Sequence, residues 1–171
     1  MTRIAAALLL LGLAACQAAP PPPVRTRAAA RPAPVVAPTT PVDGAWTFSV
    51  FADRCTARAT HRDMSVILAA GPGERASLSV SAGNRIPAGA TLRIAFRGDG
   101  GNWQLPARSD RRRLATAGWA LDAAGQERIQ DLLGGGTVTA SGTGVGAPPL
   151  ALPDAGVSGR DWFGCVSRLG G

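Results

Sequence analysis

Alternation of apolar and polar side chains is the feature of this sequence that most limits its fold. Trp46–Val50, Cys55–Ala59 and Leu92–Arg97 each place apolar residues on one side of an extended chain and mostly polar residues on the other. This period of two is typical of antiparallel strands with one buried face and one face in water. Weaker versions of the pattern predict further strands at Met64–Leu68, Leu78–Val80, Asn102–Leu105, Thr137–Ser141, Leu150–Leu152 and Trp162–Val166. The predicted fold class is therefore all-β, an antiparallel sandwich or a small barrel.

Glycine-rich segments separate these strands and predict tight turns. Gly71–Gly73 and Gly98–Gly101 each connect two alternating segments, as the loop of a β-hairpin does. Gly156–Gly159 is interpreted as a further turn. Gly142–Gly146 resembles a dinucleotide-binding loop only superficially, because residues 147–149 are Ala-Pro-Pro where a helix would have to begin.

One segment departs from the alternation and predicts a single short helix in the C-terminal third of the chain. Asp122 can cap the start of this helix and Gly134 can end it. Between them, Ile129, Leu132 and Leu133 fall on one helical face. This face can pack against the sheet.

Two of the three cysteines predict a disulfide bond. Cys55 and Cys165 lie near the two ends of the β domain, and the third cysteine belongs to the N-terminal segment. Closing so long a loop contributes on the order of 4 to 5 kcal/mol in the chain-entropy model. We expect Trp46 and Phe163 to pack beside this bond. The alternative, a zinc site, would need two further ligands, and the chain offers a single histidine, His61.

The N-terminus has the pattern of a secretory signal peptide. Arg3 precedes an apolar run, Ile4–Leu13, and the small residues Ala14 and Ala15 follow. The run is too short to span a bilayer as a permanent helix. Residues 1–15 are therefore expected to be removed on export.

The end of this segment resembles the lipobox of bacterial lipoproteins. It reads Leu-Ala-Ala-Cys at positions 13–16, and in the lipobox that cysteine is alkylated by a diacylglycerol and becomes the acylated N-terminus. The resemblance implies that Cys16 is the site of lipid attachment and that the protein is tethered to a membrane. The residue after the cysteine is Gln17, whereas in typical Gram-negative lipoproteins an aspartate at this position opposes sorting to the outer membrane. The resemblance therefore implies sorting to the outer membrane.

Residues 16–44 predict a disordered spacer. They are rich in Pro, Ala, Val, Thr and Arg and include the run Pro20–Pro23. Such a composition cannot bury a core and favours extended, polyproline-like conformations. The predicted organisation is a signal peptide (1–15), a lipidated cysteine with its linker (16–44) and a folded β domain (45–171).

The charge of the chain does not indicate nucleic-acid binding. All 18 basic residues are arginine, and the formal net charge is +7. Part of this charge falls in the leader and the spacer, which leaves the folded part mildly basic, and an exported protein meets lipid and polysaccharide rather than DNA. The lack of lysine excludes Ser-Lys hydrolases and the P-loop, and no cofactor is predicted.

The sequence predicts no catalytic residue and no metal site. His61, with Asp53 and Asp63 near it in sequence, is the one candidate for a histidine base, but the chain lacks the Gly-x-Ser-x-Gly pattern that presents a serine nucleophile. We expect His61 in an exposed loop. Asp99 and Asn102 could ligate calcium, although a glycine turn explains both residues.

One basic run is a candidate binding site. Arg111–Arg113, with Arg108 nearby, could bind an anionic group such as a lipopolysaccharide phosphate, and a solvated loop is the favoured alternative. Trp103 and Trp119 flank the run and could line a glycan or peptide surface, although core packing is the simpler explanation.

Several phrases of the β domain stand in an order that is similar to a known family. They are Trp46–Val50 with Cys55 after it, Arg85–Ile94, Leu121–Ala124, Leu132–Gly135 and the closing Gly159–Phe163. This order resembles the invasion-associated locus B (IalB) family of small exported proteins from alphaproteobacteria, although the usual cysteine set of that family is not reproduced. The resemblance implies an envelope β-sandwich, linked in some members to host-cell entry, and it supplies no catalytic residue.

A second resemblance covers less of the chain. Gly44-Ala45-Trp46 with Cys55 after it resembles the opening of the protease-inhibitor family related to the alkaline protease inhibitor, whose members are small barrels with one disulfide. In that family the second cysteine closes a short loop, whereas Cys165 comes far later in this chain.

These patterns together predict a membrane-tethered envelope lipoprotein whose folded domain is a non-enzymatic interaction or structural module. The alternative is an inhibitor of a protease or of a lysozyme-type enzyme. The expected partners are the membrane, through the N-terminal lipid, and an envelope protein or an anionic polymer.

Overall fold

The computed structural model describes residues 46–170, most of which belong to one antiparallel sheet and two helices. The predicted signal peptide, Cys16 and the predicted linker lie outside the described residues. The elements are β1 (Thr47–Val50), β2 (Cys55–His61), β3 (Met64–Gly71), β4 (Arg75–Ser81), the short 3-10 helix η1 (Gly83–Arg85), β5 (Thr91–Arg97), β6 (Asn102–Ser109), β7 (Leu114–Ala120), α1 (Ala123–Leu133), β8 (Gly136–Ser141), β9 (Leu150–Leu152) and α2 (Gly156–Leu169). The predicted all-β fold class is confirmed.

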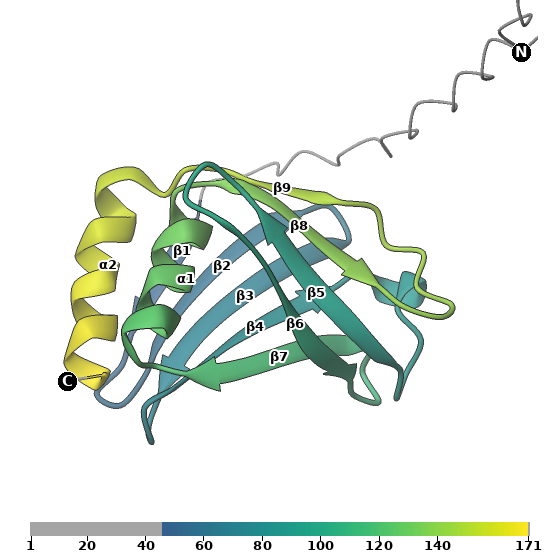
Figure 1. Cartoon of the computed structure of the whole chain (residues 1–171), viewed down its shortest axis with the longest axis horizontal. Coiled ribbons are helices and arrows are strands. Elements are labelled where there is room, and N and C mark those ends of the chain that lie inside the picture. Colours follow the sequence, from purple (N-terminus) through teal and green to yellow (C-terminus); the bar gives the residue numbers. More distant parts are fainter. Residues whose placement is uncertain (1–45, 171) are drawn as a thin grey trace, which may run out of the picture. The chain divides into compact units, whose positions relative to one another are not determined.

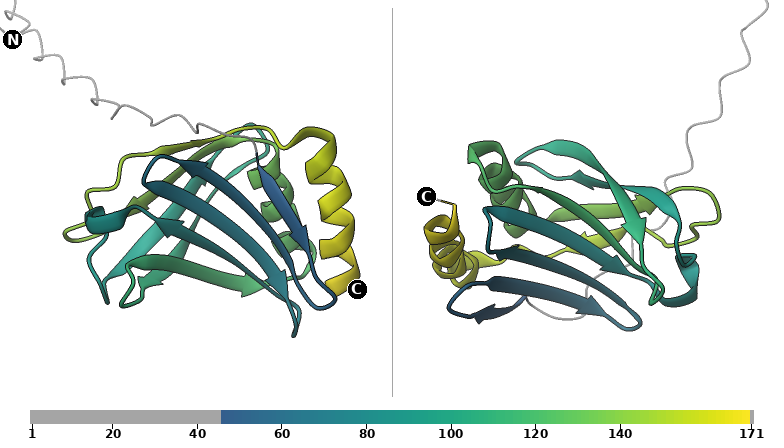
Figure 2. Two further views of the ribbon diagram at one scale, coloured as in Figure 1. Left: turned by 180° about the vertical axis from the view of Figure 1, so that it is seen from behind. Right: turned by 90° about the horizontal axis from the view of Figure 1, so that it is seen from below.

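The strands form a single sheet in the order β1-β2-β3-β4-β7-β6-β5-β8-β9, and every neighbouring pair is antiparallel. The sheet curls into a half-barrel, with β1 to β4 on one side of the core and β5 and β8 on the other (Figures 1 and 2). Because the curl remains open, β1 and β9 are its two edges.

Strand β7 is the one that the sequence analysis did not predict. Its buried positions are Ala115, Ala117 and Trp119, which alternate with exposed Thr116 and Gly118. Alanine and glycine give only a weak contrast between the two faces, so the period of two is hard to recognise. The strand is nevertheless central, because it joins β4 to β6.

The two predicted hairpin turns and the predicted helix are confirmed. The Gly71–Gly73 segment leads from β3 into β4, and backbone hydrogen bonds between Gly98 and Gly101 close the β5–β6 hairpin. The Asp122 carboxylate accepts the Gly125 N–H at 2.7 Å and caps α1. The apolar face of α1 is buried, with Ile129, Leu132 and Leu133 as its large side chains.

The segment Trp162–Val166, predicted to be a strand, is part of helix α2, and Gly156–Gly159, interpreted as a turn, is the first turn of that helix. A short apolar run fits a buried strand or a helix equally well. The buried residues of α2 are Gly159, Trp162, Cys165 and Val166. Spacings of three and four residues place them on one helical face, which lies toward the sheet.

The two helices lie beside one another at one end of the half-barrel (Figure 1), and two tryptophans fix α1 to the sheet. Trp103 Nε1 donates to Asp131 at 3.1 Å, and Trp119 Nε1 donates to the Gly125 carbonyl at 3.1 Å. The ring of Trp103 also stacks on Phe96, with 5.2 Å between ring centroids. Both tryptophans therefore serve the packing of the core.

Candidate functional site

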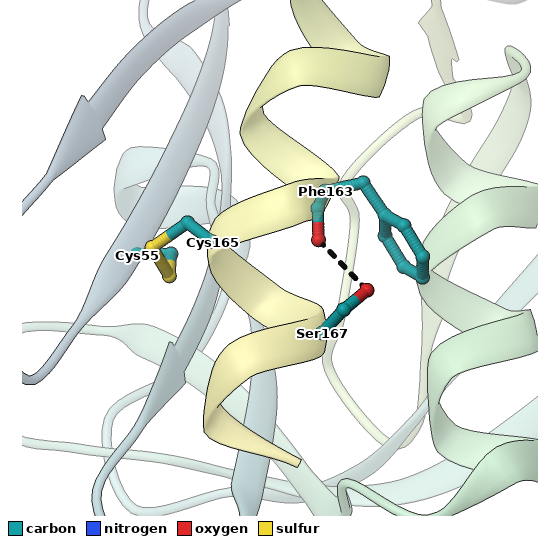
Figure 3. The surroundings of a disulfide bond; sticks show 4 residues. All are labelled: Cys55, Phe163, Cys165 and Ser167. Atoms are coloured by element: carbon teal, nitrogen blue, oxygen red, sulfur yellow. Dashed lines mark hydrogen bonds between the residues drawn. A yellow bond between two sulfur atoms is a disulfide. The ribbon is translucent and has the colours of Figure 1, made fainter. Parts of the chain in front are cut away.

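A disulfide bond joins Cys55 at the start of β2 to Cys165 in α2, as predicted (Figure 3). The two Cα atoms are 6.2 Å apart and the cysteines are separated by 110 residues in the chain. Because both cysteines are buried, the bond ties the C-terminal helix to the sheet from the inside. Its place in the fold indicates a structural bond rather than a reactive one.

The aromatic residues near this end of the molecule differ in part from the prediction. Phe163 points toward α1, on the other side of α2 from the disulfide (Figure 3). The ring that α2 directs toward β1 belongs to Trp162, whose centroid is 5.8 Å from that of Phe48. Trp46 stacks on Phe48 in turn, at 6.4 Å. The predicted contact of Phe163 is wrong because that position lies on a helix, where neighbouring residues point in different directions.

His61 lies in the core and not in an exposed loop. Its side chain is 4% exposed, because the alternation of β2 continues to the last residue of the strand and places His61 on the same inner face as Cys55, Ala57 and Ala59. The sequence analysis ended this strand too early. The described residues 46–170 contain no group of three or more His, Cys, Asp or Glu side chains that could hold a metal ion.

Asp63, near His61 in sequence, pairs with an arginine on the surface. Arg85 contacts its carboxylate at 2.9 Å, and both side chains are largely exposed. The hydrogen bond from Arg85 lowers the pKa of Asp63 below its ordinary value, and the positive charge of Arg85 acts in the same direction. This carboxylate is therefore ionised and engaged in a structural ion pair.

The predicted basic run forms the tight turn between β6 and β7. The Asp110 carboxylate accepts the N–H groups of Arg112 at 2.8 Å and of Leu114 at 2.9 Å, which fixes the turn. Arg113 has a positive φ of 64° and donates its guanidinium to Asn84. Of the three arginines, Arg111 and Arg112 are exposed.

The outer face of the sheet carries a larger set of arginines that the sequence analysis did not identify. None of the nine strands in the described part of the chain contains an aspartate or a glutamate. The strands carry five arginines, each exposed and each next to a buried position: Arg58, Arg75, Arg93, Arg97 and Arg108. We call these five residues the arginine face. The alternation itself would have revealed it, since each of these arginines falls on the wet side of its strand.

Uncharged side chains lie between these arginines. One row of paired residues runs from Arg58 through Ile67, Ser79 and Thr116 to Arg108. Within it, the hydroxyls of Ser79 and Thr116 are hydrogen-bonded at 2.9 Å. The row contains no carboxylate, and the arginines at its two ends are exposed to a partner that lies across the sheet.

The next part of the face contains a hollow of about 340 Å³. Its walls are Arg54, which precedes β2, and Arg75 at the start of β4. Its floor consists of small residues, including Ala69, Ser77 and Gly118. A hollow between two arginines on a surface without carboxylates in its strands can accept an anionic group.

A second and wider groove, of about 580 Å³, lies between α1 and α2. Its lining includes Leu133 and Phe163 as apolar residues and Gln130, Asp154 and Arg160 as polar ones. The groove carries one acid and one base, so its electrostatics favour neither sign of ligand. The arginine face and its hollow are therefore the candidate functional site.

Comparison with known proteins gives no match for this chain. No protein-family model, no curated protein and no solved structure is significantly similar to it. Among residues 46–170, no helix is long and apolar enough to cross a membrane.

Proposed function

We propose that this protein is a lipoprotein of the cell envelope, anchored in the outer membrane through Cys16, whose folded domain is a non-enzymatic interaction module for an anionic partner. The observation that carries the proposal is the arginine face, which presents five exposed arginines on strands that hold no acidic residue. Arginine suits such a role because its guanidinium offers a fork of donors to phosphate or carboxylate groups.

The location follows from the N-terminal pattern. The apolar run with Leu-Ala-Ala-Cys at positions 13–16 resembles the leader of a lipoprotein, and the resemblance of the β domain to the IalB family implies the same compartment. The disulfide between Cys55 and Cys165 suits an oxidising compartment outside the cytoplasm. An envelope surface is rich in phosphate groups, so the arginine face has a partner of opposite charge within reach.

A non-enzymatic role suits the side chains that the fold brings together. The single histidine of the chain is buried in the core, and Asp63 is held in a surface ion pair. The hollow on the sheet is lined by arginines and small residues, and its one hydroxyl, on Ser77, has no histidine or carboxylate among the lining residues to activate it as a nucleophile.

Two measurements test this proposal. We expect the full chain to partition into the detergent phase and Cys16→Ser to remain in the aqueous phase, because only a thiol forms the thioether to lipid. We expect Arg93→Ser/Arg108→Ser to weaken binding of the Cys16→Ser chain to purified lipopolysaccharide. The control, Arg160→Ser/Arg168→Ser, removes the same charge from exposed positions of α2 and should bind as the parent does. Equal loss in both variants would mean that net charge and not the arginine face is recognised.

A further inference from the structure

We propose that the tip of the β1–β2 hairpin and the hollow beside it form a contact site for a phospholipid surface, in which Arg54 and Arg75 bind one lipid phosphate while Val50 and Phe51 enter the apolar boundary. This inference rests on the proposed function, because it assigns a partner to the part of the arginine face that contains Arg75.

The strand register places the two arginines on either side of a glycine. Gly71 is paired with Arg75, and Ala70 is paired with Cys55, so the same antiparallel register brings Arg54 opposite Gly71. Two inter-strand spacings of roughly 4.8 Å separate the two arginine backbones. Since Gly71 has no side chain, both guanidinium groups can reach the same point above it.

Small residues leave room for a phosphate between these arginines. The hollow has a volume of about 340 Å³, and Ser77 contributes a hydroxyl to its floor. A Cβ atom built on Gly118 would lie 3.8 Å from Nη2 of Arg75. A longer side chain at Gly118 would therefore fill the space that the guanidinium now borders.

Neither arginine forms an ion pair within the described residues. The ion pair found in residues 46–170 joins Arg85 to Asp63, and the exposed acids next in sequence, Asp53 and Glu74, pair with neither Arg54 nor Arg75. The guanidinium of Arg54 lies over the ring of Phe51, 5.8 Å from its centroid. This contact orients one charge of the site beside an exposed aromatic ring.

Exposed apolar side chains at the hairpin tip suit contact with the apolar boundary of a membrane. Val50 is 57% exposed and Phe51 is 55% exposed. The turn that holds them lies at the same end of the sheet as the β3–β4 turn (Figure 1), and a Cβ atom on Gly71 would be 4.0 Å from the Asp53 carbonyl. Exposed apolar residues directly beside arginines are typical of segments that lie in a membrane interface, where the rings enter the boundary and the charges meet phosphates.

The test is sedimentation of the full chain with vesicles, with Cys16→Ser in every variant so that lipid attachment plays no part. We expect binding to phosphatidylcholine vesicles that contain phosphatidylglycerol and weaker binding to pure phosphatidylcholine. Arg54→Ser/Arg75→Ser should weaken binding about tenfold or more, because each arginine near an anionic surface adds to the affinity. Phe51→Ser should also weaken it, and Gly118→Val should do so while both arginines remain.

Matched controls distinguish the effect of this site from effects of net charge and of exposed apolar area. Val157 is 64% exposed in α2, so Val157→Ser removes similar apolar area elsewhere. Arg160→Ser/Arg168→Ser removes the same charge as the double variant of the site. Both controls should bind within about twofold of the parent.

Several results would overturn the inference. It fails if the parent chain does not bind either type of vesicle, or if Arg54→Ser/Arg75→Ser and Phe51→Ser bind as the parent does. Full displacement from vesicles by soluble glycerol phosphate would make the hollow an anion site without a membrane role.

If Phe51→Ser instead converts a dimer to a monomer and leaves vesicle binding unchanged, the tip is a contact between two copies of the chain. Loss of lipopolysaccharide binding in Arg93→Ser/Arg108→Ser together with normal vesicle binding in Arg54→Ser/Arg75→Ser would retain the proposed function and reject this site.

Discussion

The indole Nε1 of Trp46 donates a hydrogen bond of 2.7 Å to the carbonyl oxygen of Pro153, across a separation of 107 residues. Trp46 immediately precedes β1 and Pro153 follows β9, and these strands are the two edges of the sheet. The strands themselves are not paired, so this side chain makes the connection that strand pairing would make in a closed barrel.

We expect Trp46→Phe to lower the free energy of unfolding by about 1 to 3 kcal/mol, because the smaller phenyl ring keeps only part of the buried indole packing and the partly buried carbonyl of Pro153 loses its donor. Urea denaturation followed by circular dichroism measures this change. The control is Thr47→Val, which removes an exposed hydrogen bond to the Arg58 carbonyl and should cost much less. An unchanged unfolding midpoint for Trp46→Phe would mean that the open side of the half-barrel does not depend on this bond.

The disulfide between Cys55 and Cys165 closes most of the folded domain into one loop. We expect Cys55→Ala/Cys165→Ala to lower the free energy of unfolding by about 4 to 5 kcal/mol if the effect follows the chain-entropy model. Thermal unfolding with and without a reducing agent measures it, and the double variant itself should be insensitive to the reducing agent. Peptide mapping without reduction checks the pairing directly, and two free thiols in the native protein would contradict it.

The strands of this fold could be predicted where large apolar residues alternate with polar ones. Leu92, Ile94 and Phe96 of β5 give such a pattern, because each projects into the core from one face of the strand. Strand β7 could not be recognised, because alanine at positions 115 and 117 differs little from its neighbours in hydropathy. Its position is decided by pairing with β4 and β6, which is a property of the assembled sheet.

The last helix shows a different limit of sequence reasoning. Within Trp162–Val166 the apolar residues fit a strand or a helix, and the glycines at 156 and 159 favour a turn when considered alone. In the fold, Gly159 is buried in the first turn of α2, and its backbone N–H donates to the Ala155 carbonyl at 3.2 Å. A Cβ atom at this position would collide with the Cβ atom of Ala155, so the glycine allows the close approach of the chain that starts the helix, which no local pattern indicates.

The alternation could have revealed the arginine face, but the hollow beside it was beyond prediction for a related reason. Arg111–Arg113 stands out because its residues are consecutive, yet they form a turn in which Arg113 adopts a left-handed backbone conformation and donates a hydrogen bond to the Asn84 side chain. Arg54 and Arg75 are far apart in sequence and become neighbours only through the register of β2, β3 and β4. Contacts between strands, and not the composition of any segment, assemble the hollow.

The ion pair between Asp63 and Arg85 predicts a pH dependence of stability. The hydrogen bond from Arg85 holds the pKa of Asp63 below its unfolded value, so the pair stabilises the fold above that ordinary value, and the stabilisation is lost as the pH falls through the lowered pKa. We expect the stability of Asp63→Asn to fall less than that of the parent when the pH is lowered below about pH 4. Urea midpoints measured across this range test it, with Asp99→Asn in the exposed β5–β6 turn as control. If the urea midpoints of Asp63→Asn and of the parent fall equally at low pH, the ion pair is not the source of this pH dependence.

The last prediction concerns the turn between β6 and β7, at the end of the sheet away from the hollow, where Leu114 pairs with Ser81. Arg111 and Arg112 are exposed there, whereas Arg113 has a φ of 64° and is bonded to Asn84. We expect Arg111→Ser/Arg112→Ser to weaken binding of the Cys16→Ser chain to lipopolysaccharide without loss of stability, because exposed charges contribute little to folding.

Two features make this test specific to the turn. Binding through two arginines is electrostatic, so the difference between the variant and the parent should disappear as salt rises toward 1 M, where the Debye length is about 3 Å. Arg113→Gly removes one charge but suits the left-handed backbone, so it should match or slightly exceed the parent in stability and change binding less than the double variant. Affinity that is unchanged in Arg111→Ser/Arg112→Ser at low salt would identify the turn as a solvated loop held by Asp110, and would confine anion binding to the outer face of the sheet.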